Sequence, residues 1–318
     1  MPTGARYFWS PPKWAAVLAR GDAVDSPGQA RLLVATAALL WSLGGVLAKE
    51  IPLAGGAQAF YRSLIAGLVL WPFAPRGRRI VQPGMVFLAV IFGAMVGFYL
   101  AAIKATTAAN AIYLQCSAIF WTIPLSALWL RERVDRRSLA GIVIALVGVA
   151  LIVVKGRDGR SGESTGILLG LASGITYAAV IVGLRRFRDV DPIWLTAFVN
   201  LAGAGFLGAW IILTVGPLPL PAGRVWPLLI AFGVVQMAFP YVLFARGLQT
   251  IRASEAALIT LLEPALNPLW VWLRHDERPA GGTIIGGMFL LGGVAIRYAP
   301  WIRKRPQSAH PAVDPESR

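Results

Sequence analysis

The sequence predicts an all-α integral membrane protein with ten transmembrane helices, arranged as two inverted five-helix repeats. The prediction rests on the composition, on a series of apolar segments separated by helix breakers, and on an internal repeat. Of the 318 residues, 57% are hydrophobic and only 14% are charged, whereas soluble proteins carry roughly 45–50% apolar and about 25% charged residues. A soluble domain of this composition would expose large apolar patches and aggregate. The composition therefore excludes a soluble enzyme, a nucleic-acid-binding domain and a disordered scaffold.

The first half of the chain contains five apolar segments, each close to the 20 or so residues that a bilayer-spanning helix needs. Pro52 follows the first segment, Pro75 follows the second and Gly156 follows the fifth. The third and fourth segments are separated only by Lys104 and two threonines, which makes this boundary the weakest of the set. The predicted spans of this half are residues 31–49, 56–75, 84–104, 107–130 and 137–154.

The second half contains five more segments of the same kind. Their breakers are Pro192, Pro217, Gly247 and Pro279, because proline and glycine interrupt helices. The predicted spans of this half are residues 164–184, 191–215, 224–246, 253–273 and 280–299. We expect cytoplasmic tails at residues 1–30 and 300–318, since the first 30 residues contain no long apolar stretch of a signal peptide.

The distribution of positive charge orients these spans. Cytoplasmic loops of membrane proteins carry an excess of Lys and Arg. With both termini in the cytoplasm, the predicted inner segments hold 21 Lys and Arg residues and the outer loops hold 8. The excess of Lys and Arg in the predicted cytoplasmic segments therefore accounts for the net charge of +15, and no nucleic acid is expected as a partner. The expected partners are the lipid bilayer and a small-molecule substrate, and the oligomeric state is left open.

An internal repeat relates the two halves at an offset of 145 residues. Glu132-Arg133 falls on Glu277-Arg278, and Gly141 falls on Gly286. Repeated glycines indicate a repeated close approach of helices. Because each half contains an odd number of spans, the second half enters the membrane in the opposite orientation, as in many secondary transporters. The expected repeats are residues 31–155 and 164–299.

The order of the motifs resembles a known family. Trp41 lies in the first span, Arg62 in the second, and Leu262-Glu263-Pro264 in the second helix–Glu–helix hairpin. This pattern resembles the drug/metabolite transporter superfamily, and within it the EamA-domain family. The resemblance implies a ten-helix secondary transporter of the bacterial inner membrane. It further implies alternating access and export of small metabolites, amino acids or related compounds.

One position departs from that pattern. Where the family often has proline in the first hairpin, this chain has Ile119, and Pro124 comes later. The bend of the fourth helix is therefore expected at a different place.

Glu263 is the first candidate for a functional side chain. It is the only acidic residue well inside a predicted span, and a carboxylate at membrane depth must pair or take up a proton. Pro264 and Pro268 remove backbone donors beside it, and such a broken helix is tolerated only against protein or a water-filled cavity. Glu263 could contact a substrate amine, carry a proton or hold the opened helix together. Proton carriage also depends on Arg62, because a direct ion pair would keep Glu263 charged.

Arg62 is the second candidate, with two interpretations. It lies only about six residues into its predicted helix, roughly 9 Å from the helix start. A guanidinium at that depth can snorkel to the membrane interface or hold a helix end. Alternatively, it binds a substrate carboxylate.

Uncharged polar and aromatic residues at membrane depth complete the candidate substrate site. A Trp or Tyr in the middle of a span suits a cavity wall, whereas aromatic residues near the membrane surface form interfacial belts. Amide side chains bind substrates or link helices by hydrogen bonds. These candidates are Trp41, Tyr99, Tyr177, Tyr241 and Gln236.

Several activities are excluded or kept as alternatives. No P-loop or nucleophile elbow is present in a usable context, which excludes an ATP-driven pump within this chain. One buried carboxylate with no intramembrane His does not support an enzyme. Cys116 is the single cysteine, so neither an intrachain disulfide nor a Cys-based metal site is expected, and no cofactor is. The alternatives are a multidrug or cationic-compound exporter and a non-transporting membrane subunit.

Overall fold

The regular structure is helical throughout the part of the chain that the structure describes. The computed structural model describes residues 26–75, 77, 79–129, 136–156, 162–187, 189–251, 256 and 259–298, and within these ranges it contains no strand. The all-α prediction is therefore confirmed for these residues. Most of the expected N-terminal tail, the loop at 131–135 and the expected C-terminal tail at 300–318 lie outside the described residues.

The helices of the first half follow the predicted spans closely. The first begins at Pro27, four residues earlier than predicted, because the Ser26 side chain accepts a hydrogen bond from the Gln29 amide and caps it. The helices are α2 (Pro27–Ser42), α3 (Gly44–Glu50), α4 (Gly55–Leu70), η1 (Trp71–Phe73), α5 (Pro83–Ala105), α6 (Ala108–Cys116), α7 (Ala118–Trp129) and α8 (Arg136–Lys155).

The helices of the second half also lie at the predicted segments. They are α9 (Glu163–Arg186), α10 (Pro192–Thr214), η3 (Gly223–Val225), α11 (Trp226–Gly233), η4 (Val234–Ala238), α12 (Phe239–Thr250), α14 (Leu262–His275) and α15 (Gly281–Tyr298). Here η4 is a π-helix that joins α11 to α12. The described helices that are long and apolar enough to cross a bilayer are Pro27–Glu50, Pro83–Ala105, Glu163–Leu184, Pro192–Thr214 and Gly223–Phe244. Shorter apolar helices accompany them, and the count of ten spans stays a prediction.

The weakest predicted boundary, between the third and fourth spans, is a true helix break. Helix α5 ends at Ala105, and α6 begins at Ala108. The side chain of Thr107 accepts a hydrogen bond from the Asn110 amide at 3.0 Å and caps α6. Threonine at an N-cap stabilises a helix start, so two threonines suffice to end one helix and begin the next.

The fourth predicted span is interrupted at Ser117, seven residues before Pro124. The Ser117 hydroxyl donates to the Leu114 carbonyl, and Pro124 lies inside α7. The interruption is thus produced by local side-chain hydrogen bonding rather than by a proline.

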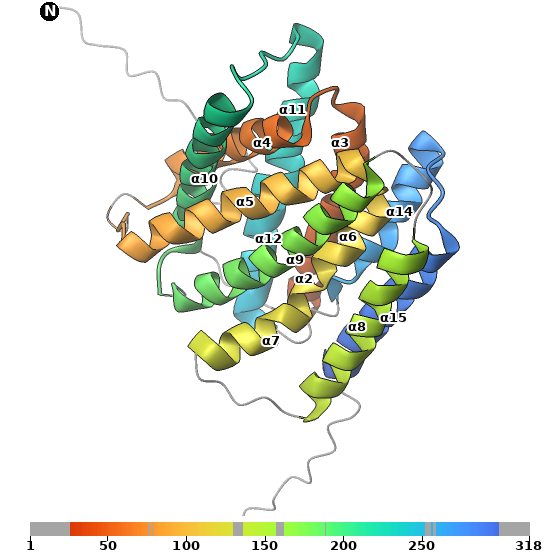
Figure 1. Cartoon of the computed structure of the whole chain (residues 1–318). Helices are drawn as coiled ribbons and strands as arrows, with labels where there is room; N and C mark the ends of the chain where they lie inside the picture. Colours follow the sequence, from red (N-terminus) through yellow and green to blue (C-terminus); the bar gives the residue numbers. More distant parts are fainter. Residues whose placement is uncertain are drawn as a thin grey trace, which may run out of the picture.

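Helix pairs from the two halves pack against each other (Figure 1). Helix α8 lies along α15, α4 packs on α10, α5 runs beside α9, and α2 packs on α12. Gly148 and Gly286 stand at the α8–α15 contact, where a Cβ on either would come within 2.6 Å of the other's carbonyl oxygen. The predicted use of Gly286 in close helix packing is therefore confirmed.

The surface and core have the polarity of a membrane protein. Large apolar side chains point outward, for example Leu213 at 83% exposed and Leu128 at 73%. Polar side chains are instead found inside, where Gln58, Asn110, Asn200 and others are fully buried. A bilayer around the helices satisfies this arrangement and water does not.

Candidate functional site

A polar cavity in the interior brings the predicted site residues together. It is lined by Trp41, Arg62, Met95, Val96, Tyr99, Ile112, Gln115, Cys116, Tyr177, Gln236, Met237, Tyr241 and Glu263. All seven candidate residues named from the sequence line it, although they come from α2, α4, α5, α9, η4, α12 and α14. Its volume is about 70 Å³. One water needs about 10–15 Å³ on this scale, so several waters or a small polar group fit.

Arg62 reaches the cavity from α4. It is only 7% exposed, so it does not snorkel to the interface. Its guanidinium lies 4.7 Å from the centre of the Phe232 ring, and one terminal NH2 group donates to the Met237 sulfur at 3.0 Å. A thioether is a weak acceptor, and the Arg62 Nε has no partner. The cavity therefore contains a buried positive charge whose hydrogen-bond donors are largely unsatisfied.

Glu263 reaches the same cavity from the first turn of α14. The chain before it forms a turn at Thr260 and Leu261, and the Glu263 amide donates to the Thr260 carbonyl at 3.0 Å. The expected helix opening beside Glu263 and Pro264 is therefore present, just before Glu263. A carboxylate at this position also benefits from the positive end of the α14 dipole.

Arg62 and Glu263 share the cavity without pairing. Both lie in the described part of the chain, and no ion pair within 4.0 Å joins them. The sequence left open whether Arg62 and Glu263 form an ion pair. In the structure both side chains line one cavity, but they are too far apart to pair. Two opposite charges held apart can each bind the opposite charge of one ligand.

Four aromatic side chains, together called the aromatic wall below, line the cavity: Trp41, Tyr99, Tyr177 and Tyr241. The Trp41 ring packs edge-on against Tyr241, with ring centres 5.2 Å apart, and lies 5.4 Å from Phe244. Tyr99 and Tyr177 line the cavity from α5 and α9. This wall offers flat apolar surfaces with polar edges, which suit the body of a small organic molecule.

Gln236 is held in place with its acceptor unused. Its side-chain NH2 group donates to the Trp41 carbonyl at 3.1 Å, and its Oε1 has no partner. A Cβ on Gly44 would lie 2.7 Å from the Gln236 amide nitrogen, so glycine is needed there for α3 to approach. Gln236 lies in the π-helix, and such turns are frequent at functional sites.

Met237, the residue that contacts Arg62, was missed by sequence reasoning. The available signal was Pro240, whose missing N–H leaves the carbonyl of Gln236 without its α-helical partner. Gln115, in contrast, has a structural partner, because its side-chain NH2 group donates to the Ser173 hydroxyl at 2.9 Å. It lines the cavity as well.

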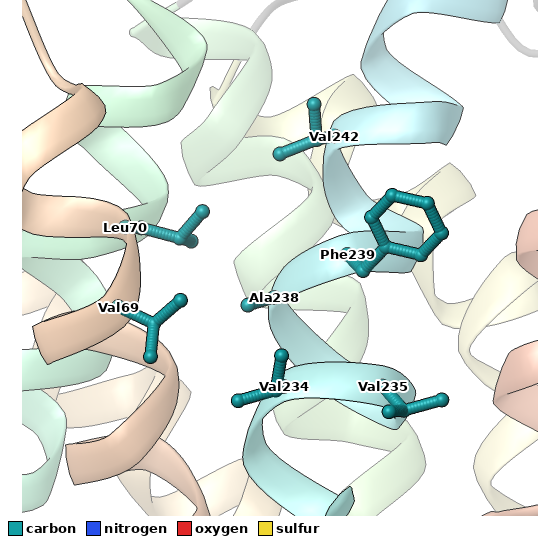
Figure 2. Close-up of a pocket in the computed structure, with 7 residues that line it drawn as sticks. All are labelled: Val69, Leu70, Val234, Val235, Ala238, Phe239 and Val242. Atoms are coloured by element: carbon teal, nitrogen blue, oxygen red, sulfur yellow. The ribbon is translucent and has the colours of Figure 1, made fainter. Parts of the chain in front are cut away.

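A second, apolar pocket lies between α4 and the segment formed by η4 and α12 (Figure 2). It has a volume of about 220 Å³ and is lined only by Val69, Leu70, Val234, Val235, Ala238, Phe239 and Val242. These side chains offer no hydrogen-bonding group for a polar ligand, so this pocket is a poor candidate for the substrate site. Among the described residues, no three His, Cys, Asp or Glu side chains gather as a metal site would require.

Comparison with known proteins gives consistent matches over both halves. The model of the EamA-like transporter family matches residues 29–154 and 164–298. An uncharacterized transporter of Archaeoglobus fulgidus is 32% identical over 75% of this chain and 85% of its own length. The pseudopaline exporter CntI of Pseudomonas aeruginosa is 28% identical over 82% of this chain and 92% of its own length. A crystal structure at 21% identity covers 88% of this chain and 100% of its own, with a TM-score of 0.65, which shows a shared fold.

Proposed function

This chain belongs to the EamA-like transporter family, and from that premise we propose that it is a secondary transporter that exports small zwitterionic metabolites. It is a transporter and not an enzyme. We propose amino acids or related compounds as the substrates and alternating access as the mechanism. The relative named as an exporter supports the direction. Membership of a transporter family argues against the non-transporting subunit.

The observation that carries the proposal is the pair of separated charges in one cavity. The unsatisfied guanidinium of Arg62 suits a carboxylate, which can accept two parallel hydrogen bonds. The carboxylate of Glu263 suits an amine. A zwitterion satisfies both charges at once, and the aromatic wall with Trp41 and Tyr241 accommodates its side chain.

The alternative substrate is an organic cation. The aromatic wall and Glu263 favour it, because aromatic faces and a carboxylate both attract cations. Arg62 opposes it, since a second positive charge in a low-dielectric cavity repels a cation. We therefore place zwitterions ahead of cations.

We further propose ten spans in two inverted repeats, residues 31–155 and 164–299, with both termini in the cytoplasm of a bacterium. The charge asymmetry and the two matched stretches support this. The packing supports it too, since α8 with α15 and α4 with α10 are the equivalent helices that a two-fold axis would bring together. The contacts of α5 with α9 and of α12 with α2 are likewise equivalent.

Counterflow in liposomes tests the proposed function. Purified protein is reconstituted, and exchange of a radiolabelled panel of zwitterionic, cationic and anionic compounds is measured. We expect exchange of zwitterions, and Arg62→Gln and Glu263→Gln should each reduce it by at least about tenfold, because each removes one charged contact worth about 1.5–3 kcal/mol. Glu50→Gln is the control, because Glu50 pairs with Arg274 outside the cavity.

The panel also separates the alternatives. Exchange of cations that Arg62→Gln improves would contradict the zwitterion proposal and favour the cation exporter. Imposing a pH gradient on the same liposomes decides whether protons drive accumulation. Indifference to the gradient would make the protein a facilitator, with Glu263 acting as a substrate contact.

A further inference from the structure

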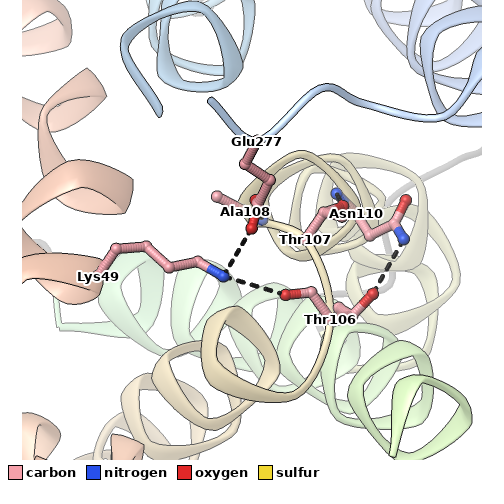
Figure 3. Close-up of polar contacts among 6 residues, drawn as sticks. All are labelled: Lys49, Thr106, Thr107, Ala108, Asn110 and Glu277. Atoms are coloured by element: carbon pink, nitrogen blue, oxygen red, sulfur yellow. Dashed lines mark hydrogen bonds and ion pairs between the residues drawn. The ribbon is translucent and has the colours of Figure 1, made fainter. Parts of the chain in front are cut away.

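A polar network lies at the start of α6, near the cavity (Figure 3). Lys49, in the last turn of α3, forms an ion pair with Glu277 in the segment between α14 and α15, with 2.9 Å between Nζ and Oε2. The Lys49 ammonium also donates to the Thr106 carbonyl at 3.3 Å. The second carboxylate oxygen of Glu277 accepts a hydrogen bond from the Ala108 amide at 2.8 Å. Three separate segments are thereby tied together.

This network lies next to the cavity along α6. Ile112 lines the cavity, and Ala108 is the residue one helical turn before it. At 1.5 Å per residue, the Ala108 amide that binds Glu277 lies about 6 Å along the helix axis from Ile112. The network and the cavity are thus one helical turn of α6 apart.

A second layer of hydrogen bonds extends the network. The side-chain NH2 group of Asn110 donates to the Thr106 hydroxyl at 3.0 Å and to the Gly156 carbonyl at 2.8 Å. The Thr283 hydroxyl donates to the Asn110 side-chain oxygen at 2.6 Å. The start of α6, the end of α8 and the start of α15 are thus connected.

The network joins the two matched halves of the chain. Lys49, Thr106 and Ala108 belong to the first matched stretch, and Glu277 belongs to the second. The Lys49 and Glu277 side chains are 16% and 8% exposed. The neighbouring Arg274–Glu50 pair is far more exposed, at 65% and 28%, so it is screened by water. Separating the halves at this end requires breaking the shielded pair.

We propose that the Lys49–Glu277 ion pair is the latch of a periplasmic gate, closed in this structure and broken when the cavity opens outward. The inference rests on the proposed function and orientation, which put the ends of α3 and α14 on the periplasmic side. It gives Glu277, part of the Glu-Arg pair repeated in both halves, a specific task. The Ala108 amide holds the carboxylate at the start of α6, so Lys49 is the group that moves away.

Cys116 makes the gate measurable without knowledge of the substrate. It is the single cysteine of the chain and lines the cavity. A membrane-impermeant, charged methanethiosulfonate reagent is applied to the outside of right-side-out vesicles, and the rate of Cys116 modification is followed. We expect slow modification of the wild type. Lys49→Met and Glu277→Gln should each raise the rate about fivefold or more, as expected for loss of a contact that biases a two-state equilibrium.

Two variants serve as controls. Glu50→Gln removes a neighbouring ion pair at the same end and should leave the rate unchanged. Lys49→Arg retains a positive charge opposite Glu277 and should also label at the wild-type rate. Modification after denaturation gives the amount of intact protein for each variant. The two latch variants test the same contact from both partners, so misfolding of one leaves the other informative.

The outcomes separate the gate from the proposed function. Unchanged rates from both sides in folded latch variants would overturn the proposal and make the network a static tie. A rate increase seen only in inside-out vesicles would overturn the periplasmic assignment. A rate increase from outside supports the gate even if the counterflow panel yields no substrate, because labelling requires no transport.

Discussion

At the scale of single residues, two hydrogen-bonding groups on side chains that line the cavity have no protein partner. The Arg62 Nε and the Gln236 Oε1 are both buried and unsatisfied among the described atoms. Each such group costs about 1–3 kcal/mol when it is removed from water without a new partner. A protein retains this cost where a ligand or bound water completes the contacts. The Arg62 Nε and the Gln236 Oε1 are therefore available to a ligand or a bound water in the cavity.

The sequence identified Arg62 and Glu263 as charged residues at membrane depth, but it did not predict which side chains they contact. Arg62 close to its helix start was equally compatible with snorkelling, and only the rotation of α4 against α11 and η4 turns it toward Phe232 and Met237. For the same reason, Glu263 could be located near a broken helix without knowing that it faces Arg62 across a gap. Helix rotation depends on packing of the whole bundle, which local sequence does not encode.

A prediction at this scale concerns the aromatic wall. Trp41→Ala and Tyr177→Ala should each weaken transport, with an apparent affinity about 3- to 10-fold lower, since an aromatic contact is worth about 0.5–1.5 kcal/mol beyond its area. Concentration-dependent uptake in proteoliposomes measures the effect. Trp210→Ala is the matched control, because Trp210 is 58% exposed on α10 and does not line the cavity. Wild-type kinetics for both cavity variants would assign these rings to packing alone.

At the scale of elements, helix interruptions gather around the cavity. Ser117 separates α6 from α7, η4 separates α11 from α12, and a turn at Thr260 and Leu261 precedes α14. Each interruption lies within a few residues of a cavity-lining side chain, namely Cys116, Gln236 and Glu263. Interrupted helices free backbone groups that must be satisfied inside the protein, so they are concentrated where polar partners exist.

Element boundaries were predictable where a capping or breaking residue acts locally. Thr107 fixes the boundary between α5 and α6, because its side chain caps α6. Pro124 gave no such information, since the break lies at Ser117 instead. A proline in an apolar helix is tolerated when neighbouring groups satisfy the freed carbonyl, so its presence alone does not locate a bend.

The α8–α15 contact supplies a prediction at this scale. Gly286→Val should destabilise the fold by about 1–3 kcal/mol, the usual cost of forcing extra methyl groups into packed helices. The added Cβ would meet the Gly148 carbonyl oxygen at 2.6 Å. The loss of monomer signal after heating in detergent, followed by size-exclusion chromatography, measures it. Gly292→Val on the same helix is the control, since a Cβ there has nothing within 4 Å. Equal losses in both variants would attribute the effect to helix propensity.

At the scale of the whole molecule, packing between equivalent helices explains how one cavity can face two sides. Helices α4 and α10, and α8 and α15, pair across the two halves. If the halves are inverted copies, a rearrangement that opens one end of the cavity has an equivalent rearrangement that opens the other. The repeated glycines and the Glu-Arg pair made this symmetry readable from the sequence. The ion pair between Lys49 and Glu277 could not be predicted from the sequence, because the two residues are 228 positions apart.

Orientation in the membrane gives the last prediction. On a Cys116→Ser background, Asp158→Cys should react with an impermeant thiol reagent only from the periplasmic side, and Arg78→Cys only from the cytoplasmic side. The physical reason is the charge bias, 21 Lys and Arg residues against 8, which holds only if the span count is ten. One span more or fewer before residue 158 would invert every later loop and remove the bias. Labelling of position 158 from the cytoplasm alone would therefore refute the ten-span topology, and with it the assignment of the Lys49–Glu277 end to the periplasm.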